Sequence, residues 1–347
     1  MQTVAIAPEP VFLNKNESPF PPLVPVIRRM REMAGRLNRY GEFKPQLPDA
    51  VAEFLGVAAN CVVVGNGSSD LLYGIARVAL RPGDRVALPD LSFGFYDVVM
   101  NNLGAQVVKV PAVGLEHDLE GLVRAARDGA RLVLACTPNN PTGKLIAPDR
   151  LQWLIDSVPP STVLLIDEAY GEFLPPSSRL DTARIASERE HIITLRTLSK
   201  LHGLAGLRVG YAVGNPVFMA QITRMQPAFH ISILAQVAAA ESLRHPRLLE
   251  QRRRFFEQER SHIVNGLDRL GVPYAPPSAN FYMVDFGTTS EAAALEFERQ
   301  NVFVTTTRIG GYVRVSIGTR EQNDAFLRAA AAILGRPSPV EEGAAVG

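Results

Sequence analysis

The chain has 347 residues, and its 36 Lys and Arg against 35 Asp and Glu leave a net charge of +1. This balance gives no reason to expect nucleic acid or an anionic membrane surface as a partner, and no run of eighteen apolar residues or cationic leader predicts membrane insertion or secretion. The two cysteines, Cys61 and Cys136, both stand in apolar runs, which is typical of buried thiols in a reducing compartment, so we expect a cytoplasmic protein.

Short β-branched runs alternate with segments of helical period from about residue 61 to residue 214. The runs are apolar on both faces, as strands covered by helices on each side must be, and the segments between them place apolar residues three and four apart. This pattern predicts an α/β domain with a seven-stranded, mostly parallel sheet. The predicted strands lie at 61–65, 85–89, 105–110, 131–136, 162–167, 192–195 and 209–214.

The pattern changes after Pro216. A long charged helix is predicted from about Ile233 to Leu270, with a kink near Pro246, and a last helix from Arg320 to about Leu334. Between them, the runs YMVDF, VFVTTT and YVRVSIG predict short strands, so we expect a smaller α+β domain. The predicted division is an N-terminal arm with part of the small domain at 1–38, a large domain at 39–232, a small domain at 233–335 and a disordered tail at 336–347.

Polar segments follow several of the predicted strands, where ligands gather in parallel sheets. GNGSSD at 65–70 offers backbone N–H groups that suit a phosphate, although such a loop is more often a turn with a helix cap. TPNNPTG at 137–143 is either a structural turn or a rigid loop that holds an Asn as a hydrogen-bond donor. Asp167 ends a buried strand, and its carboxylate needs a helix N-terminus, a cation or a cationic ring nitrogen as partner.

The stretch TLSKLHGLAGLRVG at 197–210 places Lys200 and Arg208 close together among glycines. Two such cations repel, so either both are solvated or an anion lies between them. A desolvated lysine has a lowered pKa and can attack an aldehyde as an amine nucleophile, and the forked guanidinium of an arginine suits a phosphate. The alternative for Lys200 alone is a surface lysine that follows a strand.

The order and combination of these motifs resemble the fold-type I pyridoxal-phosphate aminotransferases. GNGSSD, SFGFY, NNPTG, DEAY, TLSK with Arg208, and YVRVSIGTRE occur in this order. The segments VFLNKNESPFPP, NRYGEFKPQLPDAVAEFLG, LRTLSKLHGLAGLRVGYAVG and VRVSIGTREQNDAFL are most similar to the histidinol-phosphate aminotransferase-like branch. The resemblance extends from about Leu13 to Leu334, and it implies the fold of aspartate aminotransferase and pyridoxal 5′-phosphate as cofactor.

The resemblance also implies roles for single residues. Lys200 would form the Schiff base with the cofactor and then move a proton between Cα and C4′, and Asp167 would pair with the protonated pyridine nitrogen. Tyr170 would hydrogen-bond the 3′-oxygen, with Asn140 on its other side, and Phe93 would stack on the ring. The residues implied for the cofactor phosphate are Ser68, Ser69, Thr197, Ser199, Arg208 and, from the neighbouring subunit, Tyr40.

The role implied for Tyr40 predicts a homodimer with shared active sites. One residue departs from the family pattern here, because Gly41 replaces the proline that usually follows this tyrosine.

The expected substrates are an amino acid and a 2-oxo acid. Arg314 matches the arginine that binds the substrate α-carboxylate, and Glu17 lies in the LNKNESPF segment that borders the substrate. Thr306 stands where histidinol-phosphate enzymes have an arginine for the substrate phosphate. Arg308, two positions further along an expected strand, would point to the same face and replace that arginine imperfectly. We therefore expect an aminotransferase for an unphosphorylated amino acid.

Three alternatives stay open at this point. The first is histidinol-phosphate transamination itself, and the second is another pyridoxal-phosphate reaction, such as decarboxylation or oxidase chemistry. Arg314 favours transamination over the second, since a clamped carboxylate tends to lie in the ring plane and to be retained. The third is a non-catalytic binding protein on the same fold, which the presence of both Lys200 and Asp167 disfavours.

Overall fold

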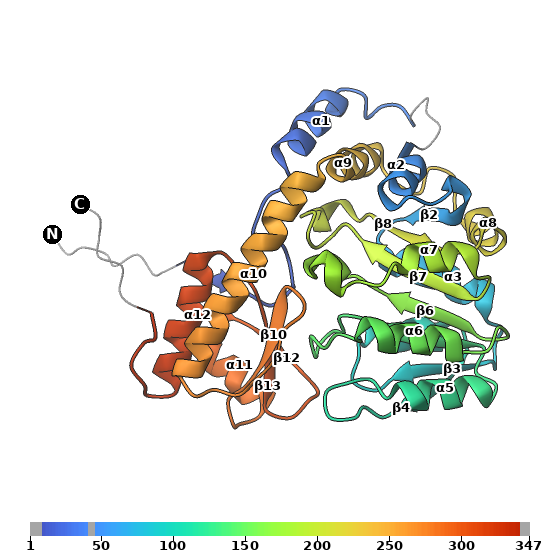
Figure 1. Cartoon of the computed structure of the whole chain (residues 1–347). Coiled ribbons are helices and arrows are strands. Elements are labelled where there is room, and N and C mark those ends of the chain that lie inside the picture. The colour runs from blue at the N-terminus through green and yellow to red at the C-terminus, as the bar shows by residue number, and fades with distance from the viewer. Residues whose placement is uncertain (1–8, 41–45, 341–347) are drawn as a thin grey trace.

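The structure is a computed structural model that describes residues 9–40 and 46–340. A larger part is built on a seven-stranded sheet and a smaller part on a four-stranded sheet, and helix α10 (Pro246–Arg269) runs from one to the other (Figure 1). Residues 341–347 of the predicted tail and Gly41 lie outside the described residues. The predicted domain boundaries remain predictions.

The seven-stranded sheet confirms the predicted α/β class. Its strands run in the order β2-β8-β7-β6-β5-β3-β4, and β8 is antiparallel to both neighbours while the other pairs are parallel. Each predicted strand is present to within two residues. The bounds are β2 (Val62–Gly65), β3 (Arg85–Pro89), β4 (Gln106–Val110), β5 (Leu132–Cys136), β6 (Val163–Asp167), β7 (Ile192–Thr197) and β8 (Gly210–Val213).

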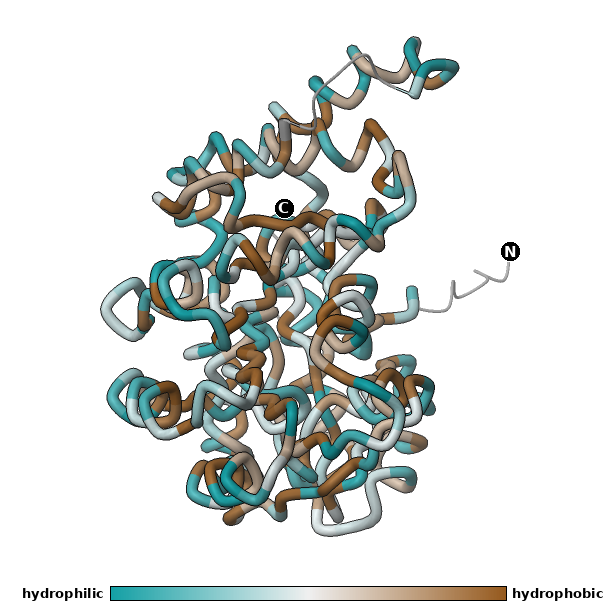
Figure 2. Tube along the Cα trace, turned by 90° about the vertical axis from the view of Figure 1, so that its right-hand side faces the viewer, coloured by the Kyte–Doolittle hydropathy of each residue, from teal (hydrophilic) through white to brown (hydrophobic). Residues whose placement is uncertain are grey.

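Helices cover both faces of this sheet. All five residues of β5 are buried because neither face of the strand reaches water. Figure 2 shows several of the helices with hydrophobic residues on one side and hydrophilic residues on the other. One face carries α5 (Leu119–Arg127), α6 (Pro148–Ser157) and α7 (Thr182–Glu188), and the other carries α3 (Ser68–Ala79), α4 (Phe95–Asn102) and α8 (Pro216–Met225).

The long helix predicted from about Ile233 to Leu270 is two helices. α9 (Ile233–Leu243) ends before His245, and Pro246 begins α10. The residue before a proline is pushed out of the helical region, and His245 has φ −117° and ψ 55°. α9 packs against α1 (Val24–Ala34) and α2 (Gln46–Leu55) at the top of Figure 1.

The smaller part is an antiparallel sheet covered by helices. Its strand order is β12-β13-β10-β9, and the helices are α10, α11 (Ser290–Arg299) and α12 (Arg320–Ile333). The predicted strand VFVTTT is divided into two short ones at Val304. The strands are β9 (Tyr274–Ala275), β10 (Phe281–Asp285), β11 (Val302–Phe303), β12 (Thr305–Thr306) and β13 (Tyr312–Ser316).

The N-terminal segment joins the smaller part before it crosses to the larger one. β1 (Val11–Phe12) pairs in parallel with β11, and α1 then packs on α9. Single 3₁₀ turns complete the chain at Ala59–Cys61, Gly171–Phe173, Pro176–Ser178 and Ala205–Leu207.

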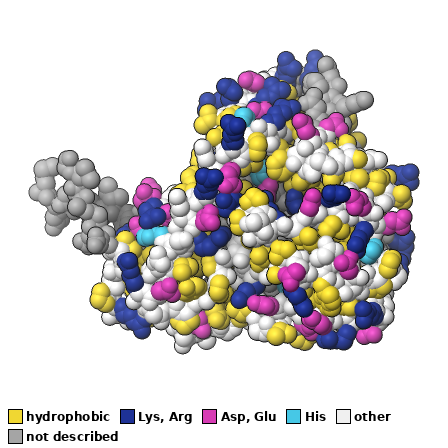
Figure 3. Space-filling model, viewed as in Figure 1, with side chains coloured by type: hydrophobic (Ala, Val, Ile, Leu, Met, Phe, Trp, Pro, Cys, Tyr) yellow, Lys and Arg dark blue, Asp and Glu magenta, His cyan; other side chains and the backbone are white. Residues whose placement is uncertain are grey.

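The surface carries mixed charge. Lys and Arg alternate with Asp and Glu over the face in Figure 3, in agreement with the net charge of +1. Within residues 9–40 and 46–340, no helix has the length and apolar character needed to cross a membrane. Cys61 and Cys136 are both buried and free.

Candidate functional site

A cavity of about 420 Å³ opens at the carboxyl ends of β2, β5, β6 and β7. It brings together twelve of the fourteen residues that the sequence predicted for the site, from segments as far apart in the chain as Glu17 and Arg314. These twelve are Glu17, Ser68, Ser69, Phe93, Asn140, Asp167, Tyr170, Thr197, Ser199, Lys200, Arg208 and Arg314.

Lys200 follows β7 and lies in a desolvated position. Its Nζ donates hydrogen bonds to the carbonyl oxygens of Asn16 at 3.0 Å and Lys15 at 3.3 Å. Burial lowers the pKa of Lys200 to about 8, and the positive charges of Arg314 and Arg208 act in the same direction against the carboxylate of Glu17. A lysine with this pKa has an appreciable fraction of neutral, nucleophilic amine near neutral pH.

One end of the cavity is suited to a phosphate. Ser68 and Ser69 form the first turn of α3, whose N-terminal N–H groups and dipole attract anions. Gly67 precedes them with φ +86°, and a Cβ there would lie 2.6 Å from Nη2 of Arg208. Only glycine therefore lets the guanidinium approach the start of this helix so closely.

Hydroxyl groups from the other side complete this end. Thr197 Oγ1 donates to Ser199 Oγ at 2.9 Å and accepts the Ser199 backbone N–H at 3.1 Å. Two hydroxyls, a guanidinium and a helix N-terminus thus meet at one place.

Asp167 ends β6 with a buried carboxylate. Its Oδ2 accepts a hydrogen bond from the Tyr96 hydroxyl at 2.7 Å, and its Oδ1 accepts the Ala169 N–H at 2.9 Å. Burial raises the pKa of Asp167 to about 6, while these two hydrogen bonds oppose that change. A cationic group facing the carboxylate would stabilise its ionised form. The ring of Phe93 lies edge-on to Tyr96 with centroids 5.5 Å apart, and 41% of Phe93 is exposed.

Arg314 reaches the cavity from β13 of the smaller sheet. Its Nη1 donates to Asn140 Oδ1 at 2.7 Å and its Nη2 to the Asn14 carbonyl at 2.8 Å. Its buried Nε has no hydrogen-bond partner among the described residues. Since a buried donor without a partner is costly, a carboxylate in the cavity would satisfy it.

A family model described as aminotransferase class I and II matches residues 8–329. The chain belongs to this aminotransferase family. The aminotransferase is 34% identical over 329 residues to a histidinol-phosphate aminotransferase of Moorella thermoacetica, which covers 93% of this chain and 85% of that protein. It is also 34% identical over 322 residues to an aromatic amino acid aminotransferase of Mycobacteroides abscessus, with 92% of each covered.

A solved structure shows the same fold. The crystal structure of histidinol-phosphate aminotransferase from Sinorhizobium meliloti, in complex with pyridoxal-5′-phosphate, matches with a TM-score of 0.87 and 26% identity over 94% of this chain and 90% of that one. The predicted family, fold and enzyme class of the aminotransferase are thereby confirmed, and the cofactor of this family is pyridoxal phosphate.

Two predicted residues lie away from this cavity. Tyr40 is 82% exposed, contacts Phe229 with ring centroids 4.8 Å apart and ring planes inclined by 30°, and lines a second cavity of about 770 Å³. The strand expected to carry Arg308 ends at Thr306, so Arg308 is not on a strand and lies in an exposed bend, because the chain turns there toward β13. Arg308 still lines a cavity of about 190 Å³ that shares Phe93, Asn140 and Arg314 with the main one.

The sequence reasoning missed two residues of the site. Asn16 bonds Tyr170, and Tyr96 bonds Asp167. Tyr96 stands three positions after Phe93 in SFGFY, a spacing that puts two side chains on one side of a helical turn, so its position was a usable signal. Asn16 stands in LNKNESPF beside Glu17, but nothing in that segment distinguishes it from its neighbours.

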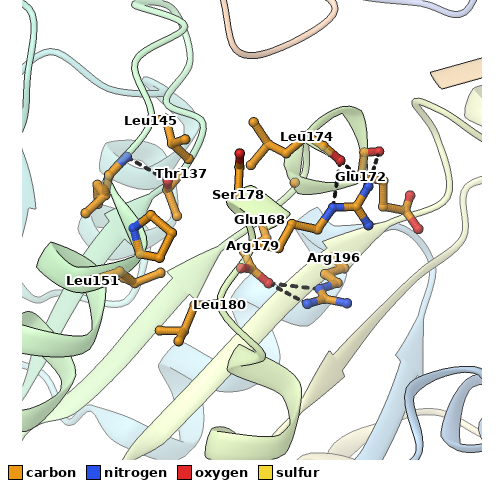
Figure 4. Close-up of a pocket in the computed structure, with 13 residues that line it drawn as sticks. Thr137, Leu145, Leu151, Glu168, Glu172, Leu174, Ser178, Arg179, Leu180 and Arg196 are labelled. Carbon is orange, nitrogen blue, oxygen red and sulfur yellow. Dashed lines mark hydrogen bonds and ion pairs between the residues drawn. The ribbon is translucent and has the colours of Figure 1, made fainter. Parts of the chain in front are cut away.

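A charged cluster of Glu168, Glu172, Arg179 and Arg196 lines a cavity of about 30 Å³, which is large enough for a single water (Figure 4). Arg196 forms an ion pair of 2.8 Å with Glu168, whose side chain is 10% exposed, and Thr182 donates to the same carboxylate at 2.7 Å. The negative charge of Glu168 raises the pKa of the adjacent Asp167. Arg196 therefore offsets a charge that would otherwise oppose ionisation of Asp167 in the aminotransferase.

Proposed function

We propose that this chain binds pyridoxal 5′-phosphate and moves an amino group between an unphosphorylated amino acid and a 2-oxo acid. The observation that supports it is the meeting of Lys200, Asp167, Arg208 and Arg314 in one cavity. Each of these side chains suits one group of the cofactor or the substrate. Lys200 offers an amine for the cofactor aldehyde, and Asp167 offers a carboxylate for the ring nitrogen. The guanidinium groups of Arg208 and Arg314 suit the cofactor phosphate and the substrate carboxylate.

The bound cofactor would supply an electron sink for the charge left at the substrate Cα when its proton is removed. Lys200 would move that proton with Nζ, for which its lowered pKa is suited. Arg314 would bind the substrate carboxylate and hold it in place, so that the C–H bond rather than the C–C bond is exposed to Lys200. Tyr170 and Asn140 would hold the ring oxygen of the cofactor.

The 190 Å³ cavity beside Arg314, where the side chain of the substrate would lie, supports an unphosphorylated substrate. Besides Arg308 and Arg314 it is lined by the uncharged Thr305, Thr306 and Thr307, by the acidic Asp90, and by Asp97, which is paired with Lys109 at 2.6 Å. The carboxylate of Asp90 would repel a dianionic phosphate, and one exposed arginine in a bend replaces a bidentate clamp poorly. The relatives named as aromatic amino acid aminotransferases are consistent with this substrate class.

Histidinol phosphate is the second candidate substrate. Arg308 lines the same cavity as Arg314, and several relatives are named as histidinol-phosphate aminotransferases.

The test is a half-reaction screen. The purified holoenzyme is mixed with single amino acids and with histidinol phosphate, and loss of the visible absorption of the lysine-bound cofactor is followed. We expect at least one free amino acid to react faster than histidinol phosphate, with a 2-oxo acid as product. A large advantage of histidinol phosphate would overturn the substrate proposal, and release of CO₂ would overturn transamination.

The same preparation tests the enzyme proposal. Wild-type protein should be yellow when loaded, and Lys200→Ala should lose the lysine-linked absorption while it retains the fold. A wild-type protein that stays colourless and binds no added pyridoxal phosphate would contradict catalysis on this fold.

We also propose that the enzyme is a homodimer with shared active sites and that it is cytoplasmic. Tyr40 and Phe229 are exposed, and the 770 Å³ cavity beside them is lined largely by apolar side chains, a surface that a second copy of the chain would cover. In such a dimer, Tyr40 of one subunit would reach the phosphate site of the other. The free, buried cysteines support the reducing compartment.

Mixing two variants tests the shared site. If Tyr40 serves the neighbouring subunit, Tyr40→Ala and Lys200→Ala homodimers are each impaired, but their mixed dimer contains one site with both residues intact. Activity should then reappear after subunit exchange. A mixture that stays as inactive as its components, with mixed dimers demonstrated by mass, would contradict the assignment.

A further inference from the structure

Asn16 joins the two parts of the molecule at the cavity. It is 1% exposed and takes a left-handed backbone conformation with φ +52°, which asparagine tolerates better than most residues. Its backbone carbonyl accepts hydrogen bonds from Lys200 Nζ at 3.0 Å and Asn280 Nδ2 at 3.1 Å. One residue of the N-terminal segment thus contacts groups from both the larger and the smaller part of the molecule.

The orientation of the Asn16 side-chain amide follows from Ser316. Ser316 Oγ accepts the Asn16 backbone N–H at 2.8 Å, so its own hydrogen is free to be donated to Asn16 Oδ1, 3.0 Å away. Because the amide oxygen is held by this hydroxyl, the Nδ2 group must face the other way. There it donates to the Tyr170 hydroxyl at 3.2 Å.

Asn140 is oriented by the same reasoning from the opposite side. A guanidinium only donates, so the atom of Asn140 that faces Arg314 Nη1 at 2.7 Å is Oδ1. Asn140 Nδ2 therefore faces the Tyr170 hydroxyl, 3.5 Å away. The Tyr170 oxygen thus lies between two N–H donors.

The hydroxyl hydrogen of Tyr170 can point at neither of these donors. Burial raises the pKa of Tyr170 to about 12, so the group is protonated at neutral pH. Tyr170 lines the 420 Å³ cavity, and among the described residues its hydroxyl has hydrogen-bond partners only in these two donors, so the cavity is the direction left for its hydrogen.

We propose that Asn16 is a positioning residue that, together with Asn140, makes the Tyr170 hydroxyl a fixed hydrogen-bond donor to the ring oxygen of the bound cofactor. This inference rests on the proposed function. Without Asn16, the hydroxyl has one donor fewer on its oxygen and can rotate away from the cavity.

The consequence can be measured in the bound cofactor. A donated hydrogen bond withdraws negative charge from the ring oxygen, so the nitrogen that links Lys200 to the cofactor holds its proton less tightly. Loss of that hydrogen bond raises the midpoint of the pH titration of the visible absorption. A purely structural role for Asn16 would change stability but leave this midpoint unchanged.

The variant Asn16→Gly removes the amide but keeps a backbone that accepts φ +52°. Its midpoint should rise by roughly half a pH unit or more, the size expected for one hydrogen bond. The matched control is Asn301→Gly, at another left-handed asparagine with φ +60°, on the turn before β11, and it should leave the midpoint unchanged.

Ser316→Ala provides a second, independent variant. It leaves Asn16 in place but frees its amide to rotate, so a smaller shift in the same direction is expected, and this variant decides alone if Asn16→Gly does not fold. Unshifted midpoints in the folded variants, with a normal titration in the wild type, overturn this inference only. A wild type that binds no pyridoxal phosphate overturns the proposed function and this inference together.

Discussion

The Tyr96 hydroxyl donates a hydrogen bond of 2.7 Å to Asp167 Oδ2, and the two side chains are only 2% and 6% exposed. Burial disfavours the charge of Asp167 and raises its pKa to about 6, whereas the hydrogen bond from Tyr96 stabilises that charge. Tyr96, whose ring contacts that of Phe93, thus supports the ionised form of Asp167, the carboxylate that is predicted to hold the cofactor nitrogen.

Tyr96→Phe should therefore weaken cofactor binding. Removing the donor raises the pKa of Asp167 further, so the carboxylate is lost as the pH falls, and the dissociation constant should increase more at pH 6 than at pH 8. The loss of a hydrogen bond to a charged group corresponds to about tenfold to a hundredfold in affinity. Tyr282→Phe is the control, because the hydroxyl of Tyr282 is buried without a partner in the part of the chain that the structure describes. Equal affinities of both variants at pH 6 would contradict this assignment.

The pKa of Lys200 predicts the pH dependence of cofactor loading. Because its folded pKa of about 8 lies below the ordinary 10.5, the neutral amine forms as the pH rises through 8. The rate at which the apoenzyme combines with pyridoxal phosphate should increase about tenfold per pH unit below 7 and level off above about 9. Stopped-flow absorbance measures this rate.

The variant Arg314→Met measures how much of the lowered pKa of Lys200 is due to the positive charge of Arg314. Arg314 lowers the pKa of Lys200, so Arg314→Met should move the inflection to higher pH. An inflection near 10.5 in the wild type would mean that Lys200 is solvated.

Alanine variants of Gly67 and Gly83 distinguish the cost of backbone strain from the loss of phosphate binding at the cavity. Gly67 and Gly83 have nearly equal φ, +86° and +89°, but a Cβ at Gly67 meets Arg208 Nη2 at 2.6 Å whereas nothing lies within 4 Å of one at Gly83. Both Ala variants should lose about 1–2 kcal/mol of unfolding free energy in urea. Only Gly67→Ala should also lose affinity for pyridoxal phosphate, as measured by equilibrium dialysis. A loss of affinity in both would point to strain alone.

The Glu168 and Arg196 pair predicts a non-additive effect on stability. The side chains are 10% and 17% exposed, so Arg196→Met leaves a buried charge unpaired and should lower the free energy of unfolding by about 3–5 kcal/mol. The double variant with Glu168→Gln should recover part of that loss. Arg184→Met, in a surface pair whose side chains are 73% and 62% exposed, should change stability by less than about 1 kcal/mol. Additive losses in the double variant would contradict coupling within the pair.

The features predictable from the sequence are those carried by neighbouring residues. The strands of the large sheet are short apolar runs that are buried on both faces, and Asp167 and Thr197 are the polar residues that end two of these strands. The sequence predicted a kinked helix at Pro246, whereas the structure has two separate helices, α9 and α10. The separation depends on how α9 packs on α1 and α2, which the sequence does not show.

The remaining features depend on distant partners. The role of Asn16 comes from Ser316 and Tyr170, which no local pattern connects to it. Arg308 was expected to continue the strand predicted at VFVTTT, but the chain bends after Thr306 to return as β13. Contacts between distant segments therefore determine where the substrate-binding residues lie, and the periodicity of the sequence does not predict such contacts.

The contact between Asn16 and Ser316 spans 300 positions of the chain. Synthesis at 5–20 residues per second takes roughly 15–60 s to cover that distance, so the first segment waits for its partner long after it has been made. The cavity also contains Arg314, which belongs to the second sheet and is made long after Lys200. A nascent chain can assemble the larger sheet early, but the cavity is finished only near the end of translation.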